Sequence, residues 1–255
     1  MLKIKNLSKT FNINTPFAKT IFDNFSLEIE KNKSTAIIGS NGCGKTTLMN
    51  IIAGSLKEDS GNIIIDDVDV TKLKEQQRSK YIGRVFQNPS FGVAPSLTIL
   101  ENLSLADKKG ERFGLKFLLN KNNVEKYKNL LKTLDLGLEN QIHTKVSLLS
   151  GGQRQSLSLL MASMKNPKLL LLDEHTAALD PKTSNVVMKK TKELIEKQKI
   201  TTVMITHNMA DAVNFSDRII MLEKGKVVLD KASKDITEEE LYEIYRKKQK
   251  EEIEK

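Results

Sequence analysis

The chain lacks tryptophan, has a single cysteine and three histidines, and only 5% of its residues are aromatic. One cysteine excludes an internal disulfide and is typical of a reducing compartment. No apolar run approaches the roughly 18 residues that a membrane-spanning helix requires, and residues 1–5 lack the apolar stretch of a secretion signal. With 255 residues, 39% of them hydrophobic, the chain can bury the core of one large α/β domain.

Arginine is also scarce, because only six of the 41 basic residues are arginines. The net charge of +9 suggests nucleic acid or an anionic membrane as a partner. The lysines, however, are spread along the whole chain, whereas nucleic-acid-binding proteins usually gather lysine and arginine on one face. A solvated, lysine-rich surface explains the charge better, and we expect no nucleic-acid partner.

The clearest motif fits the phosphate-loop pattern at every fixed position and runs Gly39-Ser40-Asn41-Gly42-Cys43-Gly44-Lys45-Thr46-Thr47. Residues 34–38 before it indicate a buried strand, and residues 46–53 after it indicate a helix that Gly54 can end. A strand, a glycine-rich turn and a helix N-terminus together make an anion site, since backbone N–H groups and the helix dipole point at the ligand. We expect Lys45 to reach the β- and γ-phosphates of a nucleotide and the Thr46 hydroxyl to bind Mg²⁺.

Residues 1–35 predict β-structure, with partial alternation of apolar and polar residues over 21–29. Phe11 lies between the strand-like segments, where an exposed aromatic ring could stack on adenine. Phe11 could equally be a core residue, and Phe17 is a rival for the stacking role. The residues alone leave these alternatives open.

Residues 61–70 predict a strand, a turn and a second strand, and the polar residues 71–80 predict a helix. Residues 82–86 predict a strand, and Gln87 stands at its end. A glutamine at a strand terminus can place its amide on a metal ion or a water molecule, although an ordinary loop glutamine would look the same. Residues 97–136 are helix-rich on the spacing of their leucines, and Ala106–Asn123 within them is expected to be a mobile connector.

Ser150-Gly151-Gly152-Gln153 precedes a helix expected over about 153–165. A hydroxyl and two glycine N–H groups at a helix start form a second anion-binding arrangement. Two such sites cannot hold one γ-phosphate from the same side. We therefore expect Ser150 to address a nucleotide that another subunit holds.

Residues 168–172 form an apolar run that predicts a central parallel strand, and Asp173 and Glu174 follow it. Ligands in such sheets bind beyond the carboxyl ends of the strands. Asp173 is then placed to hold Mg²⁺ through water, and Glu174 to orient or deprotonate an attacking water. The alternative is that the two acids only cap a helix.

A further strand is predicted over 201–206 and ends at His207, which this position favours for contact with the γ-phosphate or the water. A lone histidine is more often structural. We expect His143 on a surface loop and His175 to orient the turn after Glu174. Near the end of the chain, Thr237 and Glu240 form a capping box before a charged helix whose last residues are expected to fray.

Taken together, the phosphate loop, Gln87, residues 149–153, Asp173-Glu174 and His207 resemble the motifs of the ATP-binding cassette (ABC) family, in the family's order. The resemblance covers residues 1 to about 230, and the 149–153 signature is its most specific part. It implies a phosphate-loop core with a mostly parallel sheet, an antiparallel β subdomain and an α-helical subdomain at about 89–165. It also implies an ATP-binding domain over 1–230, which leaves 231–255 as a charged helical tail.

The resemblance assigns roles residue by residue, with ATP and Mg²⁺ as cofactors. Glu174 is similar to the family's catalytic base and His207 to its γ-phosphate switch. Phe11 resembles the adenine-stacking aromatic residue, and Asp180 the acid that communicates across a dimer. The implied metal ligands are Thr46, Gln87 and Asp173. The implied nucleotide-binding residues are Phe11, residues 39–47, Gln87, Ser150, Gly151, Gly152, Gln153 and Asp180.

The implied partners are a second copy of the chain, bound head-to-tail through two ATP molecules, and a membrane permease. An extracytoplasmic solute-binding protein would be an indirect partner, and the chain would act at the cytoplasmic face of the membrane. The string 173–183, with 206–209 and 94–99, resembles a bacterial importer branch paired with lipoproteins for tryptophan or other aromatic amino acids. The alternatives are an exporter, a lipoprotein-extracting complex or a soluble ABC ATPase.

Two departures from the commonest family pattern stand out: His175 replaces a proline, and Asn32-Lys33 replaces a Lys-Gly-Glu turn. Asparagine tolerates the left-handed conformation that such a turn needs. Residues 89–95, which follow Gln87, are apolar and poor in charge, which suggests a docking surface for the permease with Phe91 as its anchor. Alternatively, Phe91 and Val93 fill the core of the helical subdomain.

Overall fold

The computed structural model of the chain describes residues 1–109 and 123–253, with side chains as far as residue 249. In this part of the chain the strands are β1 (Leu2–Phe11), β2 (Lys19–Ile29), β3 (Ser34–Gly39), β4 (Ser60–Ile65), β5 (Val68–Asp69), β6 (Ile82–Val85), β7 (Leu169–Asp173), β8 (Thr201–Ile205), β9 (Arg218–Glu223) and β10 (Lys226–Ala232). The helices are α1 (Lys45–Ala53), α2 (Glu75–Arg78), α3 (Ile99–Asp107), α4 (Val124–Lys132), α5 (Gly151–Ser163), α6 (Pro181–Gln198), α7 (Met209–Phe215) and α8 (Glu238–Ile253).

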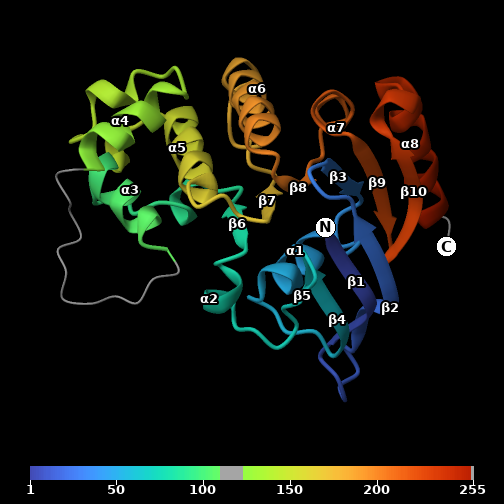
Figure 1. The fold of residues 1–255 in the computed structure, drawn as a ribbon. Helices are drawn as coiled ribbons and strands as arrows, with labels where there is room; N and C mark the ends of the chain where they lie inside the picture. Colours follow the sequence, from blue (N-terminus) through green and yellow to red (C-terminus); the bar gives the residue numbers. More distant parts are fainter. Residues whose placement is uncertain (110–122, 254–255) are drawn as a thin grey trace.

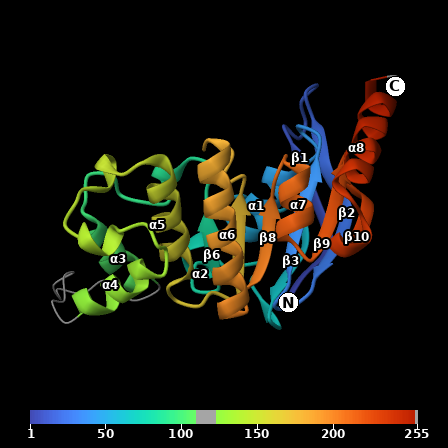
Figure 2. The same ribbon diagram turned by 90° about the horizontal axis from the view of Figure 1, so that it is seen from above.

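The strands form two sheets, which confirms the predicted fold class. An antiparallel sheet has the order β2-β1-β4-β5, and a larger sheet has the order β10-β9-β3-β8-β7-β6. In the larger sheet β9, β3, β8, β7 and β6 run parallel, and β10 is antiparallel to β9. Figures 1 and 2 show α6, α7 and α8 along one face of this sheet, and α3, α4 and α5 grouped beyond its β6 end.

The parallel strands are mostly apolar because both faces of the sheet are covered. In β3, Ile37 packs into a core shared with the antiparallel sheet and α1, whereas Ala36 and Ile38 pack into a second core with α6, α7 and α8. A third core joins α3, α4 and α5. Burial on both sides fixes which way each strand faces, because a slip of one residue would exchange the two cores.

The register of the parallel strands sets the position of the site. Gly39 at the end of β3 pairs with Leu222 of β9, and Asp173 at the end of β7 pairs with Ile205 of β8. The carboxyl ends of these strands therefore lie along one edge of the sheet. The phosphate loop, Glu174 and His207 follow β3, β7 and β8 and therefore lie at this edge.

Most of the local predictions are confirmed. Asn32 adopts φ 58°, so the turn before β3 is left-handed as expected. Thr237 and Glu240 form the capping box, with Thr237 N donating to Glu240 Oε2 at 2.9 Å. The helix predicted over 71–80 is wrong in extent, since only Glu75–Arg78 is helical. The connector predicted over Ala106–Asn123 is wrong at its start, because Ala106 and Asp107 belong to α3, and its residues 110–122 lie outside the described residues. Residues 254–255, at the end of the charged tail, lie outside them as well.

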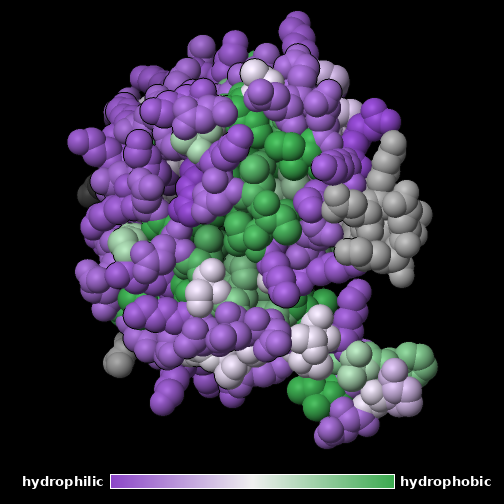
Figure 3. All heavy atoms as spheres, turned by 90° about the vertical axis from the view of Figure 1, so that its right-hand side faces the viewer, coloured by the Kyte–Doolittle hydropathy of each residue, from purple (hydrophilic) through white to green (hydrophobic). Residues whose placement is uncertain are grey.

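Hydrophilic residues cover most of the face shown in Figure 3. At the end of the molecule formed by β2, β10 and α8 they surround a central apolar band (Figure 3). Val227 and Val228 in β10 are 36% and 38% exposed. Within residues 1–109 and 123–253, no helix combines the length and the apolar character needed to cross a lipid bilayer.

Candidate nucleotide site

The phosphate loop, residues 39–47, connects β3 to α1 and depends on glycine. Gly42 and Gly44 adopt φ 80° and 113°, a region that costs a residue with a side chain about 1–2 kcal/mol. At Gly44 a Cβ would also lie 2.8 Å from the ring of Phe22 in β2. At Gly42 a Cβ would have open space, so the backbone conformation is what requires glycine there.

The start of α1 is suited to an anion. Its N-cap, Gly44, makes no side-chain hydrogen bond, and the first turn contains no acidic residue. The first N–H groups of a helix have no partner within the helix, so a phosphate can accept from them. The ammonium of Lys45 donates to Gly39 O at 2.7 Å and to Ser40 O at 3.0 Å, which holds it inside the loop. The loop therefore forms a cradle of donors at the place where a phosphate is predicted to bind.

Glu174 lies at the centre of a hydrogen-bonded cluster. Gln87 Nε2 donates to Glu174 Oε2 at 3.2 Å, and His207 Nε2 lies 2.5 Å from Glu174 Oε1. The backbone of Glu174 is left-handed, with φ 45°, and its N–H donates to Ile205 O at 3.0 Å. Gln87, Glu174 and His207, each assigned separately to the reaction on sequence grounds, are thus brought together. A cavity of about 750 Å³ opens beside Glu174 and His207.

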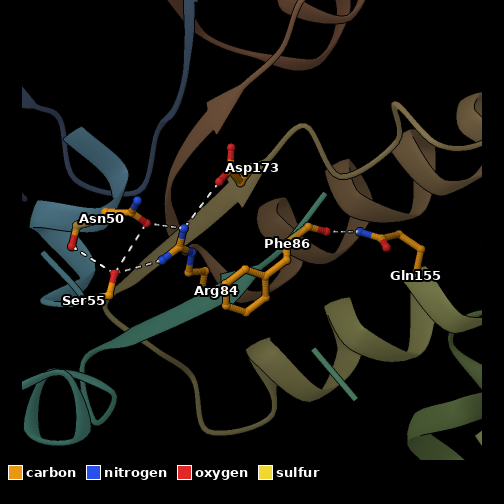
Figure 4. Close-up of polar contacts among 6 residues, drawn as sticks. All are labelled: Asn50, Ser55, Arg84, Phe86, Gln155 and Asp173. Atoms are coloured by element: carbon orange, nitrogen blue, oxygen red, sulfur yellow. Dashed lines mark hydrogen bonds and ion pairs between the residues drawn. The ribbon is translucent and has the colours of Figure 1, made fainter. Parts of the chain in front are cut away.

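Asp173 has different surroundings, shown in Figure 4. Arg84 Nη2 in β6 donates to Asp173 Oδ2 at 3.4 Å and to Asn50 Oδ1 in α1 at 2.7 Å. Asn50 is one helical turn after Thr46, so both side chains lie on the same face of α1. The Asp173 carboxylate and the Thr46 hydroxyl therefore share one side of this helix.

The proposed metal ligands have the chemistry that Mg²⁺ requires. Thr46, Gln87 and Asp173 offer hydroxyl, amide and carboxylate oxygens, and Mg²⁺ prefers oxygen ligands. In the described part of the chain no three or more His, Cys, Asp or Glu residues cluster as a metal site.

The two candidate adenine-stacking residues have different positions. Phe11 is half-buried at the end of β1, pairs with Lys19 of β2 and carries Lys9 Nζ 5.6 Å from its ring centroid. Ile21, two residues after Lys19 in β2, lies next to the phosphate loop: a Cβ at Gly44 would lie 3.0 Å from Ile21 Cγ2. Phe17 lies in the β1–β2 turn and is 79% exposed. Phe11 is therefore supported by the sheet beside the phosphate loop, whereas Phe17 extends beyond it.

The signature residues 150–153 form the start of α5. Ser150 Oγ accepts from Gln153 N at 3.2 Å, and Gln153 Oε1 accepts from Ser150 N at 3.1 Å. Ser150 is exposed, and its hydroxyl can still donate to a phosphate while it caps the helix. Helix α5 packs against α3, α4 and α6, whereas α1 packs against β3 and β7 (Figure 1). Ser150 is thus not part of the cluster around Glu174.

Close packing joins the signature to the segment that contains Asp180. A Cβ at Gly152 would lie 2.3 Å from Thr183 Cγ2, and a Cβ at Gly151 would lie 3.2 Å from Leu179 Cδ2. Asp180 caps α6 by accepting from Thr183 N at 3.1 Å, and hydrogen bonds from Thr183 lower the pKa of Asp180. Ser150 and Asp180 therefore sit on two helix ends that contact each other.

We expect Gly152→Ala to destabilise the chain by about 1–3 kcal/mol, because the new methyl group overpacks the contact between α5 and α6. Chemical denaturation measures this free energy. Gly151→Ala is the matched control and should cost less, since Leu179 can move. Thr183→Ser should rescue Gly152→Ala because it removes the clashing Cγ2. A Gly152→Ala protein as stable as the wild type would show that this contact is loose.

Cys43 lies inside the phosphate loop and is 4% exposed. Its Sγ is 3.9 Å from Lys45 Nζ, so an added group would displace the lysine. We expect alkylation of this thiol to be slow, to block ATP binding and to be slowed further by Mg-ATP. Intact-mass measurements follow it directly, because the chain has one cysteine. Equal rates with and without nucleotide would place the thiol outside the site, and Cys43→Ala should retain ATPase activity.

The other two histidines are not among the residues hydrogen-bonded to Glu174. His143 is exposed in a turn. His175 is buried, its Nε2 lies 3.2 Å from Thr191 Oγ1 in α6, and burial lowers its pKa to about 4. A neutral imidazole bonded to α6 supports the prediction that His175 orients the turn after Glu174.

Residues 22–177 match the model of the family described as ABC transporter, a span that includes the phosphate loop, Gln87, the signature and Glu174. The chain belongs to the ABC transporter family. It is 51% identical over 250 residues, 96% of this chain and 98% of the relative, to the tyrosine transport ATP-binding protein of Clostridioides difficile strain R20291. It is therefore the ATP-binding subunit of an ABC transporter, and an ATPase.

More distant relatives belong to ABC transporters as well. The chain is 36% identical to the spermidine/putrescine import ATP-binding protein PotA of Pasteurella multocida strain Pm70, with 94% of this chain matched to 60% of that protein. Its structure resembles the ATP-binding cassette MJ0796 in a dimeric post-hydrolysis state bound to ADP and Pi, with TM-score 0.77 and 32% identity over 91% of this chain and 99% of that one. ATPase domains of this family act as dimers with membrane permease partners.

Proposed function

We propose that this chain hydrolyses ATP for an importer of a small solute such as an amino acid, and that it energises a separate permease from the cytoplasmic face of the cell membrane. The observation that carries the proposal is the 51% identity, over 98% of the relative's length, to a protein named for tyrosine transport. The relative named for spermidine/putrescine import supports the direction of transport. An extracytoplasmic binding protein, a lipoprotein in this branch, would deliver the solute to the permease.

Nucleotide binding is assigned to residues 39–47 and Phe11. The N–H groups at the start of α1 and the ammonium of Lys45 donate hydrogen bonds to the phosphates, and Phe11 stacks on adenine because the sheet holds it beside the loop. Thr46, Gln87 and Asp173 hold Mg²⁺, directly or through water. When bound, the ion neutralises charge on the β- and γ-phosphates during phosphoryl transfer.

Hydrolysis is assigned to the cluster around Glu174. Its carboxylate accepts a proton from the attacking water as the general base. Gln87 and His207 hold the two carboxylate oxygens, and the Ile205 carbonyl holds the backbone N–H, so the base is fixed before the reaction begins. His207 is 43% exposed at the strand end and is free to move to the γ-phosphate while still close to the base.

The second copy of the chain completes the site. Ser150 is exposed at the N-terminus of α5, which packs against α3, α4 and α6 and not against α1, and its hydroxyl proton is available to an incoming phosphate. A head-to-tail dimer places Ser150, Gly151, Gly152 and Gln153 of one copy over ATP held by the other. Asp180 contacts the signature helix through Thr183 and communicates between the two sites.

A groove next to Gln87 is the surface proposed for the permease. It has a volume of about 720 Å³ and is lined by Phe86, Phe91, Leu105 and Met161, with Lys80 and Lys109 among its polar residues. Phe91 is 73% exposed and meets Phe86 edge to face, with 6.2 Å between ring centroids. Val93 packs against the third core instead. An apolar helix of the permease would bury Phe91 as its anchor.

Purification of the tagged chain from its own membranes in mild detergent tests the proposal. We expect a small integral-membrane permease in stoichiometric amounts, and solute-stimulated ATPase activity in the purified complex. A partner set made only of soluble proteins would support the soluble ABC ATPase instead. A membrane partner whose ATPase responds to a lipoprotein cargo, and not to a solute, would support an exporter or a lipoprotein-extracting complex.

A further inference from the structure

The guanidinium of Arg84 joins three elements at the edge of the site (Figure 4). Its side chain is only 13% exposed. From β6 it donates through Nη2 to Asn50 Oδ1 of α1 at 2.7 Å and to Asp173 Oδ2 of β7 at 3.4 Å. Its Nη1 donates to Ser55 Oγ, just after α1, at 3.4 Å. One planar group thus connects the helix of the phosphate loop to the strand that ends in Asp173.

A second set of contacts fixes the plane of this guanidinium. Arg84 Cζ lies 4.6 Å from the centroid of the Phe86 ring. The Phe86 carbonyl accepts from Gln155 Nε2 at 3.2 Å, and Gln155 is a fully buried residue of α5. Phe86 is therefore held by the signature helix and in turn supports the arginine. The sequence analysis assigned Asp173 to the site but assigned no role to Arg84 or Gln155.

We propose that Arg84 is a positioning residue that orients the Asp173 carboxylate toward the Mg²⁺ site. This inference rests on the proposed function, in which Asp173 holds the ion. Arg84 holds Oδ2 and does not engage Oδ1, so the carboxylate is kept from rotating while Oδ1 stays available. Hydrogen-bonded supports of this kind set the orientation of metal-binding carboxylates. A lysine cannot replace the arginine, because it has no second nitrogen for Ser55 and no planar group to lie against the Phe86 ring, and these contacts fix the direction of Nη2.

Orientation and electrostatic repulsion predict opposite results for Arg84. If Arg84 orients Asp173, its loss weakens metal binding. If the guanidinium mainly repels a divalent cation, its loss strengthens metal binding. The sign of the change therefore decides between the two effects.

The test uses the full chain with Glu174→Gln, loaded with ATP and separated from free nucleotide. Mn²⁺ is titrated in, and EPR of the unbound ion gives its dissociation constant. We expect Arg84→Lys and Arg84→Met each to raise this constant about tenfold. The affinity for ATP measured in EDTA should stay within about twofold, because the phosphate cradle is unchanged. A merely structural role would lower the metal-free ATP affinity and the Mn²⁺ affinity together.

Ser55→Ala is the matched control. It removes the contact to Nη1 and the Ser55 hydrogen bonds to Asn50, but it leaves Nη2 on Asn50 and Asp173, so it should leave Mn²⁺ binding unchanged. If the Arg84 variants fail to fold, Phe86→Leu provides a second test. It removes the aromatic support of Arg84 without changing Asp173, and it should raise the dissociation constant for Mn²⁺. Unchanged or tighter Mn²⁺ binding in the folded Arg84 variants would overturn the inference about Arg84 but not the proposed metal site. A parent protein that takes up no Mn²⁺ would overturn the proposed metal site and this inference with it.

Discussion

Glu174→Gln should lower the rate of ATP hydrolysis by about 10²–10⁴-fold and leave the dissociation constant for ATP nearly unchanged. The rate falls because an amide cannot accept the proton of the attacking water, and general-base catalysis typically contributes this factor. Affinity persists because the Lys45 ammonium and the N–H groups of α1 are untouched. Phosphate release and equilibrium binding of a fluorescent ATP analogue measure the two quantities.

The same variant should form a stable dimer in ATP, because closure would no longer be reversed by cleavage. Light scattering during size exclusion detects it. Glu196→Gln is a matched control, since it makes the same chemical change at an exposed position of α6, and it should behave as the wild type. A Glu174→Gln protein that hydrolyses ATP at nearly the normal rate would remove Glu174 from its assigned role.

Phe91→Ala should strongly weaken binding of the permease and reduce transport, while the isolated subunit keeps its ATPase activity. The ring is 73% exposed in the subunit, so its removal leaves no cavity there. An aromatic anchor buried at an interface typically contributes about 2 kcal/mol or more, which is roughly a 30-fold loss of affinity. Co-purification with the permease and uptake assays measure the loss, and thermal unfolding of the isolated subunit measures stability.

Tyr242→Ala is the control for Phe91→Ala. Tyr242 is also an exposed aromatic residue, 52% accessible, but it lies on α8, away from the groove (Figure 1). Its loss should leave permease binding intact. A marked loss of thermal stability in the isolated Phe91→Ala subunit would instead show that Phe91 is a core residue.

Two parts of the site could be predicted from short stretches of sequence: the phosphate loop and the strand that ends at Asp173. A strand, a glycine turn and a helix start are encoded within residues 34–53, and the left-handed glycines have no substitute. The apolar run that ends at Asp173 could be placed in a central parallel strand because both of its faces had to be buried. These inferences needed no knowledge of distant contacts.

The contacts between distant segments could not be predicted. Asn50, Arg84 and Asp173 meet only because α1, β6 and β7 pack together, and no spacing in the chain encodes that meeting. One signal was present: Arg84 is a lone charge within the apolar run 82–86. A charge in a buried strand needs partners, so it marks a contact of this kind. The helix predicted over 71–80 was too long, because polar composition does not determine where a helix begins or ends; only Glu75–Arg78 is helical.

Solute uptake by the purified complex tests most directly whether ATP hydrolysis by this chain powers import. The chain and its co-purified permease would be placed in vesicles that enclose ATP and Mg²⁺, with the solute-binding protein and labelled tyrosine outside. We predict accumulation of tyrosine, or of a related amino acid, with the wild-type chain and none with Glu174→Gln. Accumulation that persists with Glu174→Gln, or ATP-dependent movement of solute only outward, would contradict the proposal.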